Sequence, residues 1–401
     1  MTKSVCRVDM NANRALRRIC ATLAIGACML VTAQAQELSF TLHEQLIIGD
    51  DEEAPSEYLL HYPQIVRTDS QGNIYVKDAR SADVRVFDAN GRYVTTVGKR
   101  GEGPGELREV FGMHVDGDDR LIVADRMSRR LTIFTDMGKS FTTKSLAEDG
   151  RTIAPRPILS LDNSFVLKYV KLFANPEGGP SIMDDMVLHT YDVDFNRLET
   201  FAQLDDIYDL DDPFLNAYST VAGAVYVTTN GTDTIVLAPF VYGGYIYRYT
   251  RSNDKWVMEK LKGGPVPTRT FIPVSQKDRE ENQDIYRGSI STSGPTGTYR
   301  ARIFSRSSGV AILSTGEILH FPFRTPLKQD FEPRAELFNQ NGDLVGYGQL
   351  QFDNPELNGN ARVMESIRIQ WIDTADRLYL ARKNGEGFFV LSVANLEISS
   401  K

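Results

Sequence analysis

Two stretches of the chain, NIYVKDARSADVRVFDANGRYVTTV (residues 73–97) and RLIVADRMSRRLTIFTDMGKSFTTKS (residues 120–145), align without a gap at an offset of 47 residues. Apolar, acidic and turn positions coincide along the alignment, so that Asp78, for example, matches Asp125. Each stretch consists of short runs rich in Val, Ile, Tyr and Phe, separated by Gly, Asn and Asp, which favour turns. The pattern predicts a repeated unit that folds as a four-stranded antiparallel meander.

Weaker copies of this unit follow along the chain, and the last copy ends before its outermost strand. The segment LSFTLHEQLII (residues 38–48) precedes the first complete unit and can supply the missing strand. Sharing one blade between the two chain ends closes a ring of sheets and removes exposed sheet edges. The predicted fold class is therefore all-β, a six-bladed β-propeller of four-stranded antiparallel blades, closed by an N-terminal strand that completes the last blade.

The predicted blades span residues 62–97, 111–145, 156–204, 218–262, 300–350 and 363–396, with strand 38–48 added to the last blade. Two longer segments break the strand rhythm and are predicted insertions, residues 169–186 and 263–299. In the second insertion, Ser275 can cap a short helix with Asp278 as its partner.

The N-terminus has the features of an export signal. Arg14, Arg17 and Arg18 precede an apolar stretch, and the residues up to Ala35 fit a small-x-small cleavage site. The sequence predicts a signal peptide at residues 1–35 and an exported protein, either periplasmic or extracellular. The alternative is a lipoprotein attached at Cys28, although the apolar run continues beyond that residue.

The composition of residues 36–401 excludes several functions. All three cysteines lie in the first 35 residues, which excludes disulfides and thiol chemistry from the mature domain. The domain carries 40 basic and 52 acidic side chains, a net charge of −12, which disfavours binding to nucleic acid. No run of about 20 apolar residues follows the signal, so we expect no transmembrane anchor in the mature chain. We expect a monomer that binds a protein, peptide or glycan ligand.

The stretch DSQGNIYVKDARSADVRVFDANGRYVTTVGKRGEGPGEL (residues 69–107) resembles an NHL-type repeat of the secreted bacterial six-bladed propellers. The resemblance is close over residues 62–145, and the family includes binding scaffolds, structural modules and some lyases or lactonases. It implies that blade junctions and the loops between second and third strands share one face around a central channel, which we call the upper face. The ligand-binding candidates expected there are Arg100, Glu102, Glu106, Asp78, Arg80, Asp125, Arg126, Arg129, Lys168, Tyr169, Tyr242 and Arg382.

These candidates each have a structural alternative. Backbone amides between Gly101 and Gly105 could hold an anion beside Arg100, or the Gly-Pro-Gly corner could simply turn the chain. Asp78 and Asp125 end second strands, where a carboxylate can either cap loop amides or bind a cation. Tyr242, beside two glycines, is the aromatic side chain expected to remain exposed for stacking.

The acidic segment LDDIYDLDDPF (residues 204–214) could gather oxygen ligands for calcium. It lacks the spacing of a known calcium loop, which favours a solvated acidic loop. We therefore expect no cofactor and no metal site, with calcium as the alternative.

The sequence contains no recognisable set of catalytic residues. A zinc amidating lyase would need several histidines near the channel, and only His61 and His114 are expected to approach it. Neither a Gly-x-Ser-x-Gly elbow nor a phosphate-binding loop is present. We predict an exported, non-catalytic binding scaffold that uses its upper face for a protein, peptide or glycan ligand. The alternative is a channel-site metal-dependent hydrolase or lyase, either lactonase-like or amidating-lyase-like.

Overall fold

The computed structural model describes residues 35–51, 53–145, 147–148, 151–152, 155–156, 158–174, 180–219, 225–294, 297–324 and 332–401. The chain divides into two units, Met1–Gln34 and Ala35–Lys401, and every described residue belongs to the second. Residues 1–34 of the predicted signal peptide, including Cys28, lie outside the described residues.

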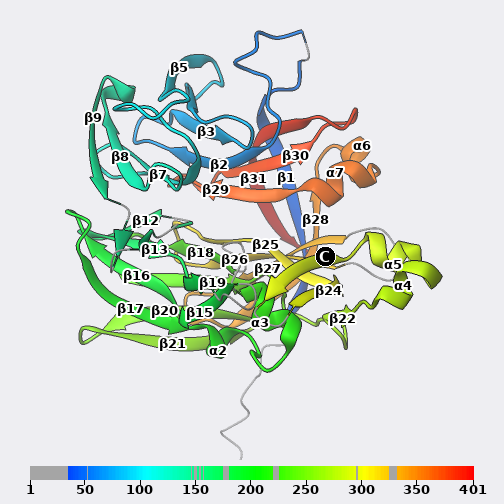
Figure 1. Ribbon diagram of the computed structural model, residues 1–401. Helices are drawn as coiled ribbons and strands as arrows, with labels where there is room; N and C mark the ends of the chain where they lie inside the picture. The colour runs from blue at the N-terminus through cyan, green and yellow to red at the C-terminus, as the bar shows by residue number, and fades with distance from the viewer. Residues whose placement is uncertain are drawn as a thin grey trace, which may run out of the picture. The chain divides into compact units, whose positions relative to one another are not determined.

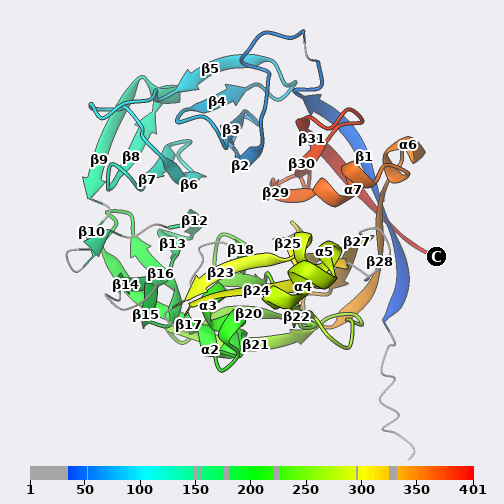
Figure 2. The ribbon, with the colours of Figure 1, turned by 45° about the vertical axis from the view of Figure 1, so that its right-hand side comes forward.

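The second unit is a β-propeller in which six four-stranded blades are arranged in a ring (Figures 1 and 2). Blade 1 contains β2 (Pro63–Thr68), β3 (Ile74–Asp78), β4 (Val84–Phe87) and β5 (Tyr93–Val97). Blade 2 contains β6 (Val110–Val115), β7 (Leu121–Asp125), β8 (Arg130–Thr135) and β9 (Ser140–Ser145), with a 3-10 turn, η1 (Asp136–Gly138), before β9. The strands of the two blades follow the 47-residue repeat, so the predicted meander is confirmed.

The other four blades have the same antiparallel order. Blade 3 contains β12 (Ile158–Leu161), β13 (Ser164–Lys168), β16 (Met186–Asp192) and β17 (Arg197–Gln203). Blade 4 contains β18 (Val225–Thr229), β19 (Thr234–Pro239), β20 (Tyr245–Ser252) and β21 (Lys255–Lys262). Blade 5 contains β25 (Ser305–Ile312), β26 (Ile318–Arg324), β27 (Glu332–Phe338) and β28 (Leu344–Phe352). Blade 6 contains β29 (Arg368–Ile372), β30 (Leu378–Lys383), β31 (Phe389–Ser400) and β1 (Gln36–Ile48).

Strand β1 closes the ring, as the sequence predicts. It pairs antiparallel with β31 from Leu38 to Ile48 and thereby completes blade 6. It also pairs in parallel with β28, the outer strand of blade 5, which the sequence did not indicate. Blades 5 and 6 consequently form one eight-stranded sheet with β1 inside it. The ring is therefore closed by a strand that has hydrogen-bonded neighbours on both sides.

The remaining elements are insertions between or within blades. Blade 3 contains the hairpin β14 (Lys171–Ala174) and β15 (Pro180–Asp184), and the short strands β10 (Ala147–Glu148) and β11 (Arg151–Thr152) precede the blade. Two helices, α2 (Leu204–Ile207) and α3 (Pro213–Ser219), follow it, and α6 (Pro355–Asn358) and α7 (Ala361–Ser366) precede blade 6. The largest insertion contains β22 (Phe271–Pro273), α4 (Gln276–Glu281), α5 (Gln283–Arg287), β23 (Ile290–Gly294) and β24 (Gly297–Ile303).

The largest insertion has its own three-stranded sheet, in the order β22-β24-β23. Strand β24 therefore belongs to the insertion, which extends to Ile303 and not only to residue 299. The predicted helix cap is confirmed, because Ser275 and Asp278 exchange hydrogen bonds in a capping box at the start of α4. Among the residues that the structure describes, no helix combines the length and apolar character that crossing a membrane requires.

Neighbouring blades are joined by apolar packing and by a repeated polar contact. Tyr75 and Val86 of blade 1, for example, pack with Phe134 of blade 2 in a buried cluster. In addition, the amide and hydroxyl of Ser70 donate to the Asp119 carboxylate of the next blade at 2.7 and 2.6 Å. Ser314 of blade 5 makes the same pair of hydrogen bonds to Asp376 of blade 6, also at 2.7 and 2.6 Å. The contact therefore recurs at equivalent hairpin turns.

His43 on β1 lies between two carboxylates. Its Nδ1 lies 3.0 Å from the Asp353 carboxylate after β28, and its Nε2 lies 3.0 Å from the Glu397 carboxylate on β31. Hydrogen bonding to Glu397 and then to Asp353 raises the pKa of His43. A raised folded-state pKa stabilises the fold fully below the ordinary histidine pKa, about 6.5, and this stabilisation is lost as the pH rises through the folded-state pKa.

We therefore expect the His43→Gln substitution to destabilise the protein more at pH 5.5 than at pH 9. Urea unfolding of wild type and variant at both pH values measures the difference. The double variant Asp353→Asn, Glu397→Gln serves as the control, because it removes both carboxylates and should remove the pH dependence of the His43 contribution. Equal destabilisation by His43→Gln at the two pH values would show that the two ion pairs contribute nothing to closure.

Candidate functional site

The innermost strands of all six blades enclose a cavity of about 280 Å³ in the channel. Residues of β2, β6, β12, β18, β25 and β29 contribute to its wall. Consecutive residues of some of these strands line the cavity, as Tyr226, Val227 and Thr228 of β18 do. The cavity is therefore built from positions that are far apart in the sequence.

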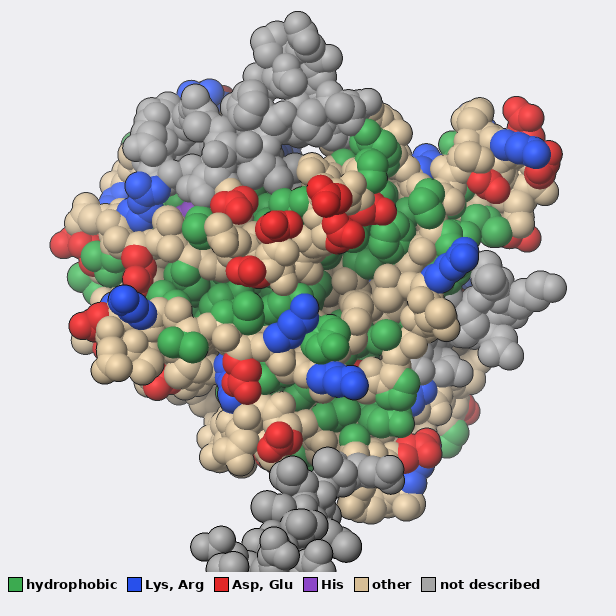
Figure 3. Space-filling model, turned by 90° about the horizontal axis from the view of Figure 1, so that it is seen from below, with side chains coloured by type: hydrophobic (Ala, Val, Ile, Leu, Met, Phe, Trp, Pro, Cys, Tyr) green, Lys and Arg blue, Asp and Glu red, His purple; other side chains and the backbone are tan. Residues whose placement is uncertain are grey.

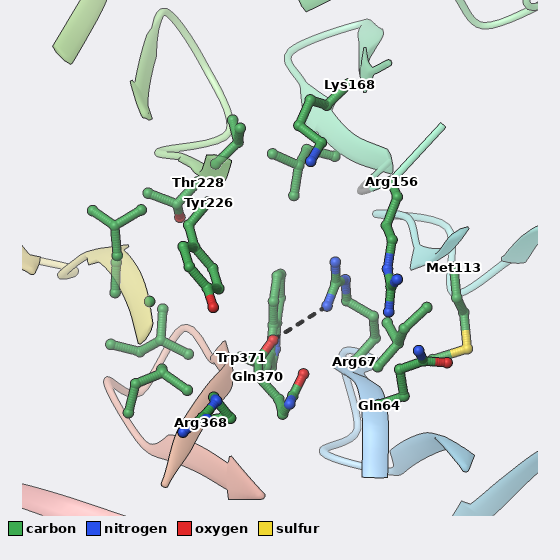
Figure 4. Close-up of a pocket in the computed structure, with 18 of the residues that line it drawn as sticks. Gln64, Arg67, Met113, Arg156, Lys168, Tyr226, Thr228, Arg368, Gln370 and Trp371 are labelled. Carbon is green, nitrogen blue, oxygen red and sulfur yellow. Dashed lines mark hydrogen bonds between the residues drawn. The ribbon is translucent and has the colours of Figure 1, made fainter. Parts of the chain in front are cut away.

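Four cationic side chains line the cavity: Arg67, Arg156, Lys168 and Arg368. Figure 4 shows that they lie on different sides of a common space. They come from three blades. Arg67 lies on β2 of blade 1, and Arg368 lies on β29 of blade 6. In blade 3, Arg156 precedes β12, and Lys168 is the last residue of β13. No aspartate or glutamate is among the described residues of this wall. The wall is thus strongly positive in a protein whose net charge is −8.

Arg67 is held in place without a carboxylate. Its guanidinium lies over the Trp371 ring, 4.5 Å from the ring centroid, and Nη1 donates to the carbonyl of Val66 at 2.6 Å. A longer contact, 3.5 Å, joins Nη1 to the carbonyl of Gln370 (Figure 4). Trp371 itself is fixed because its indole donates to Thr68 Oγ1 at 3.0 Å. The side chain is 4% exposed, and its buried Nε has no hydrogen-bond partner among the described residues.

The other cations are also positioned by neutral groups. Arg368 Nη1 donates to the carbonyls of Glu365 and Ile367 at 3.0 and 2.7 Å. The guanidinium of Arg156 lies 5.4 Å from the centroid of the Phe111 ring. Within the described part of the chain, Arg67, Arg156 and Arg368 make no ion pair with a carboxylate. The positive charges therefore remain available to a ligand.

Burial and mutual repulsion shift the pKa values of this cluster. Burial, followed by the charge of Arg156, lowers the pKa of Lys168 to about 7. Burial alone lowers the pKa of Arg67 to about 10, and burial and then the charge of Arg67 lower the pKa of His114 to about 3. Each shift has the sign expected when a basic group is buried, because desolvation disfavours its charged form. A bound anion would act in the opposite direction and favour the charged forms.

Neutral polar groups complete the cavity wall. The side chains of Tyr62, Gln64, Tyr226, Thr228 and Gln370 line the same space as the cations. In Figure 4, the Tyr226 hydroxyl and the amide of Gln370 are directed toward its interior, and the amide of Gln64 lies beside Met113. Gln370 Nε2 makes a weak contact with the Tyr62 hydroxyl at 3.4 Å. The Tyr226 hydroxyl and the Gln64 amide make no hydrogen bond to another described residue.

The opposite end of the channel has a different character. A second cavity of about 850 Å³ shares Leu159, Thr228, Trp371 and Ile372 with the first one and opens among the turns between first and second strands. Asp69, Asp116, Asp119 and Asp373 lie in this part of the wall. The carboxylates of Asp69, Asp116 and Asp373 accept hydrogen bonds from the backbone of their own turns. These aspartates therefore stabilise hairpins, and the channel is cationic toward one face and acidic toward the other.

The mixed outer surface contrasts with this separation of charge. On the face that Figure 3 shows, acidic, basic and apolar side chains are interspersed. Many of the exposed charges are paired, as Arg126 is with Glu109 at 2.9 Å and Lys144 with Asp194 at 3.1 Å. The channel differs from this surface because its three arginines are gathered around one cavity and no carboxylate is among the described residues of the wall.

The glycine-rich corner is exposed and makes contacts within itself. Glu102 pairs with Arg108 at 3.0 Å, and Glu106 pairs with Lys99 at 3.0 Å while accepting a hydrogen bond from the Gly103 amide. Arg100 is exposed and forms a backbone bridge to Leu107. A ligand role for Arg100, Glu102 and Glu106 remains a prediction.

The two predicted aspartates cap loops. Asp78 accepts hydrogen bonds from the amides of His61, Tyr62 and Arg80 at 2.6, 3.2 and 3.1 Å. Asp125 accepts the equivalent bonds from Arg108, Glu109 and Ser128 at 2.7, 3.1 and 3.0 Å. The recurrence in two blades favours the structural alternative. The side chains of Arg80, Arg126 and Arg129 are exposed on the same loops.

Three other candidates are buried in the protein interior. Tyr169 stacks on His189 with ring centroids 3.8 Å apart, and Arg382 pairs with Glu44 of β1 at 2.7 Å. Tyr242, which the sequence predicts to be exposed, is 1% exposed and donates to Glu336 at 2.7 Å. Of the predicted candidates, Lys168 is the one whose side chain lines the 280 Å³ cavity.

Sequence reasoning missed Arg67, Arg156 and Arg368. A signal for two of them was present, because Arg67 and Arg368 occur in innermost strands, PQIVRT and RIQWI, which are otherwise largely apolar or amide-bearing. An innermost strand borders the channel, and a charged side chain on such a strand can reach solvent only through the channel. Arg156 precedes its strand, and only the folded structure brings it to the cavity.

A serine, a histidine and a glutamate also come together, in the interior between blades 4 and 5. Ser307 Oγ lies 2.8 Å from His320 Nε2, and His320 Nδ1 lies 2.9 Å from Glu336 Oε2. This order of groups resembles a hydrolase triad. Ser307 is only 1% exposed, however, and its hydroxyl also contacts the Pro239 carbonyl at 2.6 Å. The three residues form a buried structural network that no substrate reaches in this conformation.

The acidic segment around α2 and α3 is organised by its own backbone. Asp209 accepts a hydrogen bond from the Asp211 amide at 3.1 Å, and Asp212 accepts bonds from Phe214 and Leu215 at 2.9 and 3.0 Å. Within the described ranges, no group of three or more His, Cys, Asp or Glu side chains is arranged to hold a metal ion. Calcium binding therefore remains an untested alternative.

Comparisons with known proteins agree with the fold. The DUF5128 family model, described as a 6-bladed beta-propeller, matches residues 53–148, which include blades 1 and 2. A crystal structure of a DUF4221 family member from Bacteroides vulgatus aligns with a TM-score of 0.56 and 12% identity over 92% of this chain and 100% of its own. A "Putative exported protein" from Bacteroides fragilis aligns with a TM-score of 0.50 and 12% identity over 93% of this chain and 97% of its own.

A gluconolactonase from Xanthomonas campestris aligns less well, with a TM-score of 0.45 and 11% identity over 91% of this chain and 99% of its own. No curated protein matches the sequence. The chain is therefore similar in fold to six-bladed β-propellers.

Proposed function

We propose that this protein is an exported binding scaffold that holds an anionic ligand in its central channel. The observation that supports the proposal is the convergence of Arg67, Arg156, Lys168 and Arg368 on a cavity whose described wall contains no carboxylate. The signal-like N-terminus supports export to the periplasm or the cell exterior, and the 47-residue repeat supports a relationship to NHL-type propellers.

The energetics of buried charge support this proposal. A desolvated charge destabilises a protein by several kcal/mol unless a partner or hydrogen bonds compensate for it. Arg67 is buried, yet its compensation consists of two carbonyl contacts and one aromatic ring. Groups that are kept at a cost to stability are concentrated at functional sites. The arrangement is one that a bound carboxylate, sulfate or phosphate would stabilise.

The proposed ligand therefore carries at least one anionic group, and it belongs to a small molecule, an acidic peptide or an acidic glycan. Arginine forms paired hydrogen bonds to planar carboxylates and to phosphates, which makes three arginines a specific choice for such groups. The binding mode requires no metal cofactor. A metal-dependent hydrolase or lyase would require carboxylate or imidazole ligands where this cavity has guanidinium groups.

Anion-dependent thermal unfolding tests the proposed function. We expect acetate, sulfate or phosphate, titrated at constant ionic strength, to raise the melting temperature of the wild-type protein, because a ligand that binds the native state stabilises it. The double variant Arg67→Gln, Arg368→Gln should bind these anions at least about tenfold more weakly. Without ligand it should be as stable as wild type or more stable, since two repelling buried charges are removed.

The matched control is the double variant Arg100→Gln, Glu102→Gln in the exposed corner on the upper face. It alters the same number of charged residues at the site that the sequence predicts, and it should retain the wild-type response to anions. An unchanged anion response in the channel variant, or a response lost only in the corner variant, would contradict the proposal.

A further inference from the structure

The volume of the cavity limits the size of the ligand that it can hold. The space enclosed by the cations and the neutral polar groups is about 280 Å³, at the lower end of the range of ligand pockets, roughly 300 to 1,000 Å³. It can hold one ring-sized residue but not a folded peptide or several sugar units side by side. A longer ligand would have to place its terminal residue in the cavity.

The neutral side chains indicate what this residue carries besides its anionic group. Tyr62, Tyr226 and Thr228 present hydroxyls, and Gln64 and Gln370 present amides, around the same space. Each of these five groups can both donate and accept a hydrogen bond. A ligand that satisfies them must itself have groups that donate and accept, and the hydroxyls of a sugar do both. An aromatic or aliphatic acid would leave the polar groups of the wall without partners, which disfavours binding.

Tyr226 is the most informative of these groups. In Figure 4, its ring lies between Thr228 and Arg368, with the hydroxyl toward the cavity. The hydroxyl makes no hydrogen bond to any residue that the structure describes, and burial raises its pKa, so it remains a neutral donor. The Tyr226 hydroxyl can bond to a hydroxyl of the ligand while the neighbouring Arg368 binds an adjacent carboxylate of the ligand.

We infer that the channel recognises a single sugar acid residue, a hydroxylated ring that bears a carboxylate, either free or at the end of an acidic glycan. The inference rests on the proposed function, because it assumes that the cations bind the anionic group. The carboxylate pairs with arginine and lysine side chains, and the ring hydroxyls bond to the tyrosine, threonine and glutamine side chains.

Isothermal titration calorimetry with three probes of similar size tests this inference. Glucuronate carries both the carboxylate and the hydroxyls, cyclohexanecarboxylate carries the carboxylate alone, and glucose carries the hydroxyls alone. We expect glucuronate to bind at least about tenfold more tightly than either of the others, because each of them leaves one set of wall groups unpaired. The Tyr226→Phe variant should weaken the binding of glucuronate by about fivefold or more and leave that of cyclohexanecarboxylate unchanged. Its melting temperature should match that of wild type, since the hydroxyl has no hydrogen-bond partner among the described residues.

The outcomes separate this inference from the proposed function. If cyclohexanecarboxylate binds as tightly as glucuronate, or if Tyr226→Phe leaves the affinity for glucuronate unchanged, the ligand is not selected by its hydroxyls and the inference is overturned, while anion binding stands. If none of the three probes binds, the inference of a sugar acid is overturned as well. The separate titration of acetate, sulfate and phosphate then decides whether the proposed anion binding stands. If glucose binds as tightly as glucuronate, the cations do not bind the ligand, and both proposals are overturned.

Discussion

A chain that lacks residues 36–48 is expected to lose the cooperative unfolding transition of the propeller. Strand β1 is paired on both sides, with β31 and with β28, so its removal leaves two long unpaired edges. Leu38, Phe40, Leu42 and Ile48 of β1 are all buried. Burial of each such side chain stabilises a fold by about 1.5–3 kcal/mol, and together they approach the whole stability of a typical domain, about 5–15 kcal/mol.

Circular dichroism and size-exclusion chromatography measure this loss directly, and point variants keep the prediction testable if the truncated chain does not accumulate. Phe40→Ala should destabilise the protein by about 3–5 kcal/mol, because it empties a fully buried site. Gln45→Ala, at an exposed position of the same strand, should change stability by less than about 0.5 kcal/mol. Equal effects of these two substitutions, or an unchanged melting transition after the deletion, would contradict the role of β1 in closing the ring.

Gly348 on β28 provides a separate test of the parallel pairing. A Cβ atom at this position would collide with the backbone carbonyl of Leu38 on β1, so only glycine permits this close approach of the two strands. Gly348→Ala should therefore weaken the junction of blades 5 and 6 while the antiparallel pairing of β1 with β31 remains.

The second large effect is expected at the buried network around Glu336. Its carboxylate accepts hydrogen bonds from His320 at 2.9 Å, from Tyr242 at 2.7 Å and from the Gly264 amide at 2.9 Å. These groups come from blade 5, blade 4 and the start of the largest insertion. Glu336→Ala leaves all three without their acceptor, and the loss of one partner in a buried ionic network destabilises a protein by about 3–5 kcal/mol. Denaturant unfolding measures this value.

The matched control is Glu259→Gln, because Glu259 pairs with Arg248 at an exposed position of blade 4. Exposed ion pairs contribute at most about 1 kcal/mol, so this substitution should have a much smaller effect. A small effect of Glu336→Ala, similar to that of the control, would show that the network does not join the blades.

The network also predicts a dependence on pH. Burial acts to raise the pKa of Glu336, but the hydrogen bond and charge of His320 and the hydrogen bonds from Tyr242 and Gly264 outweigh it and hold the pKa below its ordinary value. A lowered folded-state pKa stabilises the fold above the unfolded-state pKa, about 4.3, and the stabilisation is lost as the pH falls through the folded-state value. The difference in stability between wild type and Glu336→Gln should therefore shrink as the pH is lowered from 6 to 3.

The sequence alone predicted the six blades and the closing strand because the signals that specify them are local. The alternation of apolar residues and the turn residues at fixed offsets act within a single blade, and the 47-residue repeat shows the same pattern in the next blade. The closing strand could be predicted from residues 38–48 because an incomplete last unit requires a partner for its edge. The helix cap at Ser275 is likewise encoded in four consecutive residues.

The tertiary structure alone decided which side chains meet. Arg67 and Arg368 are separated by about 300 residues in the chain, yet they share one cavity because the ring brings the first and last blades together. Tyr242 and Arg382 are candidates by their position at loops or strand ends, but their partners, Glu336 and Glu44, come from other parts of the chain and hold them in the interior. Strand alternation determines the side of a sheet on which a residue lies. Whether that side faces the channel, a neighbouring blade or solvent depends on packing between blades, which no local pattern encodes.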